Sequence, residues 1–312
     1  MRRLIINADD FGIASGVNRG VVDGHQNGVV TSATLMACGA RFDEAVALAA
    51  QAHKLSVGCH VVLVDGSPML AGSQVSSLTA PNSGLESRFR ESLVSFALLA
   101  ATGRLDRHQI EAEITAQIQK LQAAGISVSH LDSHKHTHMF PVVLKSMLRA
   151  ARNCGVRAIR NPFEPLIFIS ISANMIFANM RQWKRQFQLR ILRGYRATFR
   201  KELAESGMFT PDGCIGMAAT GGLTLATFQA LIENLPEGTW EFVSHPGYHD
   251  ADLNQVKTRL RDSREKELAI LTSDSVKQLL HNERIELISY RDLASVMGAP
   301  PEVPSPLTLK SD

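Results

Sequence analysis

Acidic and imidazole side chains recur at the ends of apolar, strand-length segments of this 312-residue chain. Asp9 and Asp10 end the run that begins at Leu4, and His60 and His245 lie in two later runs. Such side chains are costly in an apolar core unless they are paired or bind a metal ion. Their repetition therefore indicates one polar pocket at one end of a sheet or barrel. Metal-dependent hydrolysis is the chemistry that such a set of residues can perform.

The densest group of these residues is the segment His-Leu-Asp-Ser-His-Lys-His-Thr-His at 130–138. Strand alternation would place every second residue on one side if the strand ran that far, but we expect a bend near Ser133. Imidazole and carboxylate groups suit zinc and similar divalent ions. The spacing leaves open which histidines bind the metal and which orient ligands or contact substrate. The candidates are His130, Asp132, His134, His136 and His138.

The adjacent carboxylates Asp9 and Asp10 are expected to differ in role, because successive strand side chains point to opposite sides. A turn starting there would let one bind metal while the other acts as a base. His245 is a candidate acid or base near neutral pH. Each residue also has a structural alternative: a capped Asp-Asp-Phe-Gly turn, a hydrogen-bonded core position for His60, and a turn position for His245.

Strand-like runs alternate with helical patterns along the chain, which predicts a parallel sheet with helical crossovers. About seven strands favour an α/β fold of the distorted or incomplete (β/α) TIM-like barrel type, and a doubly wound open sheet is the alternative. In both architectures the ligand site lies at the C-terminal ends of the strands. The expected strands are 3–8, 31–37, 56–64, 127–132, 156–160, 239–244 and 285–289, and the expected helices are 16–27, 42–53, 106–124, 141–154, 224–234, 262–281 and 291–297.

We expect a single barrel domain over residues 1–297, with insertions at about 65–90 and 161–224. Residues 65–90 and 203–224 are rich in Gly, Ser or Pro and are interpreted as long loops near the site. The proline-rich tail at 298–312 is expected to be flexible.

The cysteines, the N-terminal apolar run and the distribution of charge exclude several classes of protein. Four cysteines without short paired spacing argue against a disulfide framework or a four-cysteine zinc site, and they suit the reducing cytoplasm. The apolar run from Leu4 to Ile6 is too short for a signal-peptide core. Residues 181–201 hold eight Lys and Arg and no acid, against a net charge of +3 for the whole chain. This local cluster argues against nucleic-acid binding.

The segment 166–201 has two interpretations. Its first 15 residues, 166–180, are apolar but too few to span a bilayer. The basic stretch that follows carries aromatic and aliphatic residues at helical spacing. The segment could therefore lie as an amphipathic helix on an anionic membrane, which would place the protein peripherally at the inner face of that membrane. Alternatively, its helices cover the barrel with a solvated charged face.

Taken together, the motifs resemble the YdjC-like (ChbG-type) carbohydrate deacetylase family. The resemblance covers most of the chain and implies a distorted (β/α) barrel, one divalent metal ion and hydrolysis of N-acetyl groups on sugars. Its blocks are Asn-Ala-Asp-Asp-Phe-Gly (7–12), Asn-Gly-Val-Val-Thr-Ser-Ala-Thr (27–34), Gly-Cys-His (58–60), His-Leu-Asp-Ser-His-Lys-His-Thr-His-Met-Phe-Pro (130–141), Ser-His-Pro-Gly (244–247) and Ser-Tyr-Arg-Asp (289–292).

By position, the resemblance implies Asp10, His60 and His134 as metal ligands, Asp9 as the base and His245 as the acid. The ligand types favour zinc, cobalt or iron, whereas the resemblance also points to magnesium. The residues expected to bind substrate or support the ligands are Asp132, His136, His138 and Arg160.

A finer match concerns residues 60–66, His-Val-Val-Leu-Val-Asp-Gly, which resemble the branch associated with hopanoid biosynthesis. It implies N-acetylglucosamine linked to a hopanoid lipid as the substrate. The alternatives are deacetylation of soluble chito-oligosaccharides, a metal-dependent phosphoesterase, and an inactive carbohydrate- or lipid-binding protein. The expected partners are an N-acetylated sugar or glycolipid and, through 166–201, a membrane. A homodimer stays open, because no segment identifies an interface.

Overall fold

A curled sheet of parallel strands is the framework of the structure, a computed structural model that describes residues 1–80, 87–176 and 193–298. The sheet has seven strands in the order β4-β3-β2-β1-β6-β5, with β7 paired to β1. This incomplete TIM-like barrel confirms the predicted α/β class. The strands are β1 (Arg2–Phe11), β2 (Ser32–Leu35), β3 (Ser56–Val61), β4 (Leu131–Ser133), β5 (Gly213–Ile215), β6 (Gly238–Ser244) and β7 (Glu286–Leu287).

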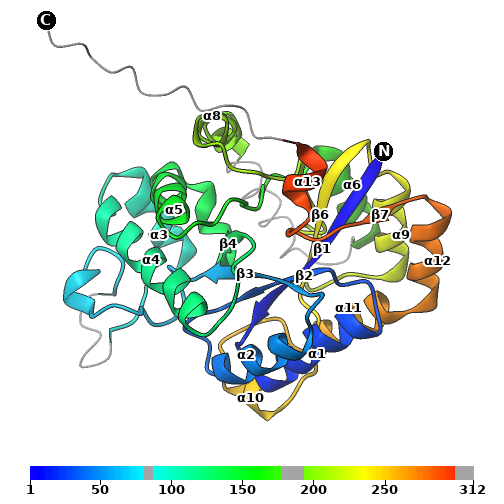
Figure 1. Ribbon diagram of the computed structural model, residues 1–312, viewed down its shortest axis with the longest axis horizontal. Coiled ribbons are helices and arrows are strands. Elements are labelled where there is room, and N and C mark those ends of the chain that lie inside the picture. Colours follow the sequence, from blue (N-terminus) through cyan, green and yellow to red (C-terminus); the bar gives the residue numbers. More distant parts are fainter. Residues whose placement is uncertain (81–86, 177–192, 299–312) are drawn as a thin grey trace, which may run out of the picture.

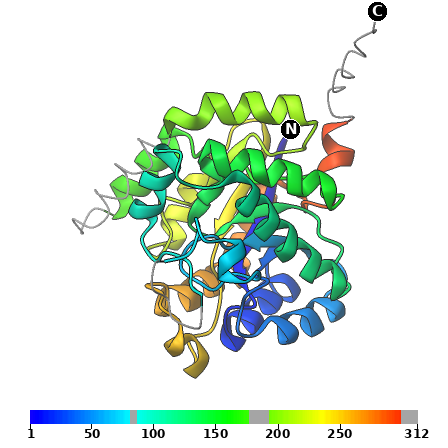
Figure 2. The ribbon, with the colours of Figure 1, turned by 90° about the vertical axis from the view of Figure 1, so that its left-hand side faces the viewer.

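Helices surround the sheet (Figure 1). Among them, α8 packs on α5 (Figure 2), where Lys145 and Glu202 form an ion pair of 3.1 Å. The helices are α1 (Ser15–Gln26), α2 (Phe42–Gln51), α3 (Leu93–Ala101), α4 (Arg107–Ala123), α5 (Pro141–Asn153), α6 (Leu166–Ile176), α8 (Arg196–Ser206), α9 (Leu225–Glu233), α10 (Ala251–Gln255), α11 (Asp262–Thr272), α12 (Asp274–Asn282) and α13 (Leu293–Met297), with 3₁₀ segments at Gly72–Gln74, His134–Met139 and Arg193–Tyr195.

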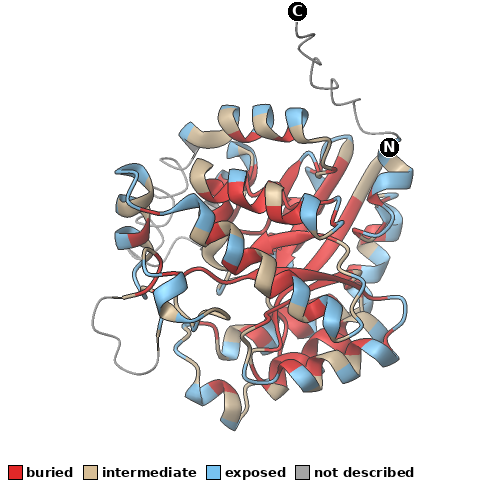
Figure 3. Cartoon of the chain, turned by 60° about the vertical axis from the view of Figure 1, so that its left-hand side comes forward, coloured by how far each residue is buried: buried red, intermediate tan, exposed pale blue. Residues whose placement is uncertain are grey.

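Burial explains why these segments form strands and helices. In Figure 3 the strands are buried at the centre, and the surrounding helices turn their buried faces inward. Parallel strands covered on both sides need continuous apolar runs, and β1 is buried from Leu4 to Phe11. A helix that covers such a sheet needs only one apolar stripe. In α4 that stripe is fully buried, and it consists of Ile110, Ile114, Ile118 and Leu121.

One predicted strand and one predicted loop are wrong. Residues 156–160 form only single parallel bridges, Leu131 to Ile159 and Ala158 to Phe209. The predicted loop 203–224 instead contains β5, which pairs with β6, and the end of α8. A strand of three residues is too short to show alternation in the sequence, so β5 escaped prediction.

The predicted helix 262–281 is two helices, α11 and α12. The break is at Ser273, whose backbone is extended (φ −71°, ψ 144°) and whose hydroxyl accepts a hydrogen bond from the backbone N–H of Val276. A serine in this position is a favoured N-cap, so it starts α12 rather than continuing α11. Helices α3 and α10 were not predicted.

Parts of the predicted loops and tail lie outside the described residues. The segment 65–90 contains the 3₁₀ turn Gly72–Gln74 and an antiparallel bridge from Thr79 to Phe89, but residues 81–86 fall outside the description. So do 177–192, which hold much of the basic stretch, and the tail from 299. Among the helices that the structure describes, none is both long enough and apolar enough to cross a membrane.

Candidate metal centre and active site

A cavity of about 1110 Å³ opens at the C-terminal ends of the strands. Its wall holds residues from β1, the end of β3, and the segments that follow β4 and β6. This is the edge of the sheet at which the predicted residues were expected to meet. The residues that carry the chemistry are Asp9, Asp10, His60, His134, His136 and His245.

An irregularity in β1 brings two adjacent aspartates into this one cavity. The pairing of β1 with β2 shifts between Ala8 and Phe11, so that β1 contains one residue more than its neighbour. Within the shift, Asp10 adopts a left-handed backbone (φ 64°). A bulge of this kind redirects side chains that would otherwise alternate. Asp9 and Asp10 therefore both line the cavity, and a bulge within β1 stands where the sequence suggested a turn.

Asp10, His60 and His134 form a cluster that could hold a metal ion. One ligand atom from each lies within 4.8 Å of the others. Oδ1 of Asp10 is 3.4 Å from Nε2 of His60 and 3.4 Å from Nδ1 of His134. Two imidazoles and one carboxylate, with room left beside them in an open cavity, are typical of catalytic zinc sites.

The hydrogen bonds behind His60 fit this ligand role. Its Nδ1 faces Oδ1 of Asp132 at 2.8 Å, which leaves Nε2 directed toward Asp10. A carboxylate behind a histidine fixes the ring and raises its basicity. Burial alone lowers the pKa of His60, but Asp132, Asp9 and Asp10 outweigh burial and raise that pKa to about 9. A divalent ion can take the place of the proton that these carboxylates hold there.

His134 owes its position to the end of β4. The strand stops at Ser133, as expected, and the two residues after His134, Lys135 and His136, have left-handed backbones with φ of 53° and 54°. Successive left-handed residues other than glycine are uncommon. The turn places His134 and His136 in the cavity wall. His138 is instead fully buried, with its Nδ1 2.6 Å from Oγ of Ser133.

Asp9 is held by a buried guanidinium. The side chain of Arg160 donates to Oδ2 and Oδ1 of Asp9 at 2.8 and 2.6 Å. It also pairs with Asp132 at 2.7 Å and Glu241 at 2.6 Å, and Tyr290 donates to Glu241 at 2.5 Å. Burial raises the pKa of Asp9, but Arg160, His60 and His245 together outweigh this effect and lower the pKa well below the usual range. Asp9 is therefore a charged acceptor with a fixed orientation.

Arg160 also bears on how many ions the site can hold. A second group of potential ligands consists of Asp9, His60 and Asp132. Both carboxylates of this group already pair with the one buried guanidinium of Arg160, and its third member, His60, also belongs to the first group. The arrangement favours a single ion bound by Asp10, His60 and His134 over a two-metal centre.

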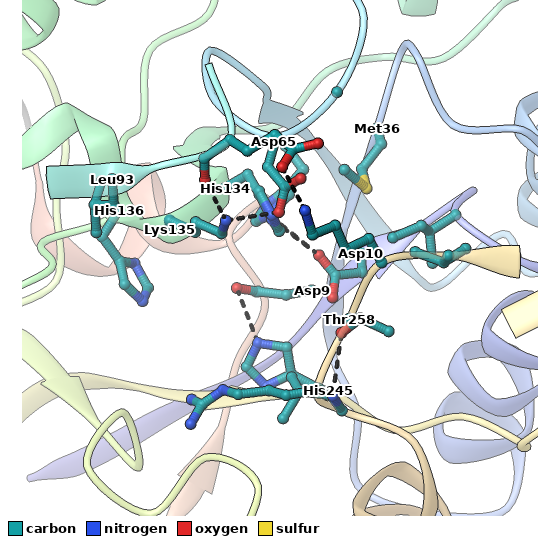
Figure 4. A pocket seen from close by; sticks show the side chains of 18 of the residues that line it. Asp9, Asp10, Met36, Asp65, Leu93, His134, Lys135, His136, His245 and Thr258 are labelled. Carbon is teal, nitrogen blue, oxygen red and sulfur yellow. Dashed lines mark hydrogen bonds and ion pairs between the residues drawn. The ribbon is translucent and has the colours of Figure 1, made fainter. Parts of the chain in front are cut away.

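His245 lies beside Asp9, across the cavity from His134 (Figure 4). Its Nε2 is 3.9 Å from Oδ2 of Asp9, and its Nδ1 is 3.9 Å from Oε2 of Glu267. Glu267 also accepts a hydrogen bond of 2.7 Å from the His245 backbone N–H. Burial outweighs both nearby aspartates and lowers the pKa of His245 to about 4. The imidazole is therefore neutral near pH 7 in the metal-free protein.

Helix α11 supplies a residue that the sequence motifs do not mark. Arg264 is buried and donates from Nη2 to Oδ2 of Asp10 at 2.6 Å. Oδ1 of Asp10 is left to face the two histidines. Burial raises the pKa of Asp10, but Arg264 and His134 outweigh it and lower the pKa well below the usual range. In the sequence, Arg264 resembles any charged residue of an exposed helix.

We expect Arg264→Met to weaken metal binding by about 10- to 100-fold, the usual effect of removing a residue that orients a ligand. The measurement is zinc affinity by competition with a chromophoric chelator. Arg259→Met is the control, because Arg259 lines the same cavity and is exposed. Equal zinc affinity in the two variants would show that Arg264 does not orient Asp10.

The remaining residues of the site lie in three places: behind the candidate ligands, in the cavity wall, and in the core. Asp132 and Arg160 are fully buried behind the ligands, and His136 lines the cavity. His130 stacks on Tyr290, with ring centroids 3.6 Å apart, and belongs to the core. The supporting residues that the motifs did not assign are Thr34, Glu241, Arg264, Glu267 and Tyr290. Of these, Thr34 and Tyr290 lie within the matched blocks 27–34 and 289–292.

Comparison with known proteins identifies the family of the chain. The model of the YdjC-like protein family matches residues 3–282. A carbohydrate deacetylase of Brevibacillus brevis is 34% identical, over 93% of this chain and 99% of that protein. Carbohydrate deacetylase 1 of Listeria innocua is 29% identical, over 93% and 100%. A crystal structure of an Enterococcus faecalis protein named for cellobiose-phosphate cleavage has a TM-score of 0.73 and 25% identity, over 94% and 99%. The chain belongs to the YdjC-like protein family, together with these carbohydrate deacetylases.

Proposed function

We propose that this protein hydrolyses the N-acetyl group of an N-acetylated sugar and releases acetate and the free amino sugar. The observation that carries the proposal is the cluster of Asp10, His60 and His134 in one cavity with Asp9 and His245. The names of the relatives, carbohydrate deacetylases, support the same reaction.

The three ligands suit one divalent ion. Two imidazoles and a carboxylate favour zinc by ligand type, and magnesium stays an alternative that histidine-rich sites suit less well. When bound, the ion supplies Lewis-acid chemistry, which polarises an acyl oxygen and makes water more acidic. Asp10, His60 and His134 would hold it, and Arg264 and Asp132 would orient two of these ligands.

Asp9 and His245 would move the protons. Asp9 is ionised, faces the cavity beside the candidate ligands and would accept a proton from the attacking water, while its ion pair with Arg160 fixes its orientation and lowers its basicity. The departing amine must gain a proton, and His245 would donate it. A neutral His245 first has to acquire that proton, and Asp9 lies 3.9 Å from its Nε2, a separation that one bridging water would span. The proton taken from water could thus reach the amine through these two residues.

For the substrate, we propose N-acetylglucosamine linked to a lipid such as a hopanoid. The cavity is larger than a single sugar ring requires, and α3 exposes Val94 and Leu98 one helical turn apart, in the helix that Leu93 of the cavity wall begins. Such side chains suit contact with a lipid or a membrane surface. Soluble chito-oligosaccharides are the alternative substrate.

Two other functions fit the site less well. A two-metal phosphoesterase would need a second ligand set, and Arg160 already pairs with both carboxylates of that set. A carbohydrate-binding protein without activity would need neither Asp9 beside the ligands nor His245 within reach of it.

The test is acetate release by the purified protein, before and after chelation. The substrates are an N-acetylglucosaminyl hopanoid and an N-acetylchito-oligosaccharide. We expect chelation to abolish release and zinc to restore it. Faster turnover of the lipid-linked sugar supports the lipid substrate, and faster turnover of the soluble sugar contradicts it. Metal-loaded protein that releases acetate from neither substrate would contradict the deacetylase proposal.

A further inference from the structure

An ion pair lies beside the metal-ligand cluster. Nζ of Lys135 donates to Oδ2 of Asp65 at 2.6 Å, and both residues line the cavity. Figure 4 shows them on the side of His134, across from His245. Asp65 follows the ligand His60 by five residues, and Lys135 directly follows His134. The pair is therefore tied through short stretches of backbone to two of the three candidate ligands.

The backbone at this pair is strained. Asp65 has φ of 60° and Lys135 has φ of 53°, both in the left-handed region, and neither is glycine. Strained residues persist only where the surrounding structure holds them, and they cluster at functional sites. A partly exposed ion pair adds little net stability, so a role in tying two loops together does not account for this backbone strain. A role in holding both side chains at fixed positions in the cavity accounts for it.

The pair retains hydrogen-bonding capacity toward the cavity. Within the part of the chain that the structure describes, Oδ1 of Asp65 accepts no hydrogen bond. An ammonium group has three donors, and Lys135 uses one toward Asp65 and one, at 3.5 Å, toward the carbonyl oxygen of Glu91. The side chains of Lys135 and Asp65 are 32% and 19% exposed. A free acceptor next to a free donor matches the donor and acceptor capacity of neighbouring hydroxyl groups.

We propose that Asp65 and Lys135 form the subsite that binds ring hydroxyl groups of the sugar unit whose acetamido group lies at the metal-ligand cluster. This inference rests on the proposed deacetylase function and deepens it. The ligand class is a hexosamine with neighbouring free hydroxyls, whatever aglycone it carries. Asp65 accepts from one hydroxyl, and Lys135 donates to the same or the next one.

The test compares Asp65→Asn and Lys135→Met with wild type on an N-acetylchito-oligosaccharide and on analogues that each lack one ring hydroxyl. We expect KM to rise by roughly 10- to 100-fold in each variant, the effect of losing one hydrogen bond to a charged group, and kcat to change less. On the analogue without the bound hydroxyl, wild type and variant should have similar KM values. Unchanged KM in folded variants, or an equal KM rise on every analogue, overturns the proposal.

Glu91→Gln and Arg259→Met are the matched controls. Both residues line the same cavity, and the two substitutions make similar charge changes while leaving the backbone carbonyl of Glu91, which Lys135 contacts, in place. We expect KM to stay near the wild-type value. An equal KM rise in the controls would mean that charge in the cavity, not hydroxyl binding, causes the effect, and it would overturn the proposal.

Failure of the deacetylase function can be told apart from failure of the subsite. If wild type releases no acetate from any sugar, binding of the free chitosan oligosaccharide is measured by titration calorimetry instead. Loss of binding in Asp65→Asn, with binding retained in Glu91→Gln, supports the subsite without the reaction. Equal binding in both variants overturns it.

Discussion

Asp9→Asn is expected to lower kcat by about 10²- to 10⁴-fold, the usual contribution of a general base, while the bound metal stays unchanged. The asparagine keeps the shape of the side chain and one oxygen for Arg160, but it cannot accept a proton from water. The metal should remain because its candidate ligands are Asp10, His60 and His134. The measurements are kcat for acetate release and metal content of the same preparation.

Asp132→Asn is the matched control for Asp9→Asn. Like Asp9, Asp132 is a buried carboxylate that pairs with Arg160. Unlike Asp9, it contacts His60 and does not line the cavity. Its substitution should weaken metal binding and leave kcat at saturating metal much closer to wild type. If Asp9→Asn turned over substrate at the wild-type rate, Asp9 would have no part in the mechanism.

His134→Ala is expected to abolish metal binding at micromolar metal and, with it, activity. It removes one of the three candidate ligands, so the loss should exceed the roughly 10- to 100-fold caused by removing an outer partner. The protein should stay folded, because His134 lies at the cavity wall and not in the apolar core. Zinc content after dialysis and the midpoint of thermal unfolding, each compared with wild type, check both expectations.

His138→Asn is the control for this variant. It comes from the same motif, but its side chain is buried against Ser133, away from the ligand cluster. We expect His138→Asn to retain zinc. Equal zinc content in His134→Ala and wild type would remove His134 from the ligand set, and the cluster would have to be completed by another residue.

Much of the fold could be predicted from the sequence, because strands buried on both faces require unbroken apolar runs. The runs around β1, β3 and β6 are of this kind and were predicted at nearly their observed positions. Short elements lack such a signal. β5 has only three residues, and its pairing with β6 supplies the stability that its own sequence does not indicate.

Within the site, motifs could predict the residue types but not their partners. Arg264 lies 254 positions from Asp10, and Glu241 lies 81 positions from Arg160. Both look like ordinary charged residues locally, since nothing in a neighbouring stretch reveals what lies across the barrel. Their burial becomes tolerable only because each faces an opposite charge.

The sequence by itself determined which chemical groups this protein could use and placed them at the ends of apolar strands. Only the tertiary structure decided which of these groups face the candidate metal site, which could transfer protons and which are buried in the core. The bulge in β1 turns Asp9 and Asp10 into one cavity, and the turn after Ser133 directs His134 to the ligand cluster and His138 away from it. Arg160 then sets Asp9 apart from the ligands. The reason is physical: ligation and proton transfer depend on distances of about 3 Å, and folding alone sets such distances between residues far apart in the chain.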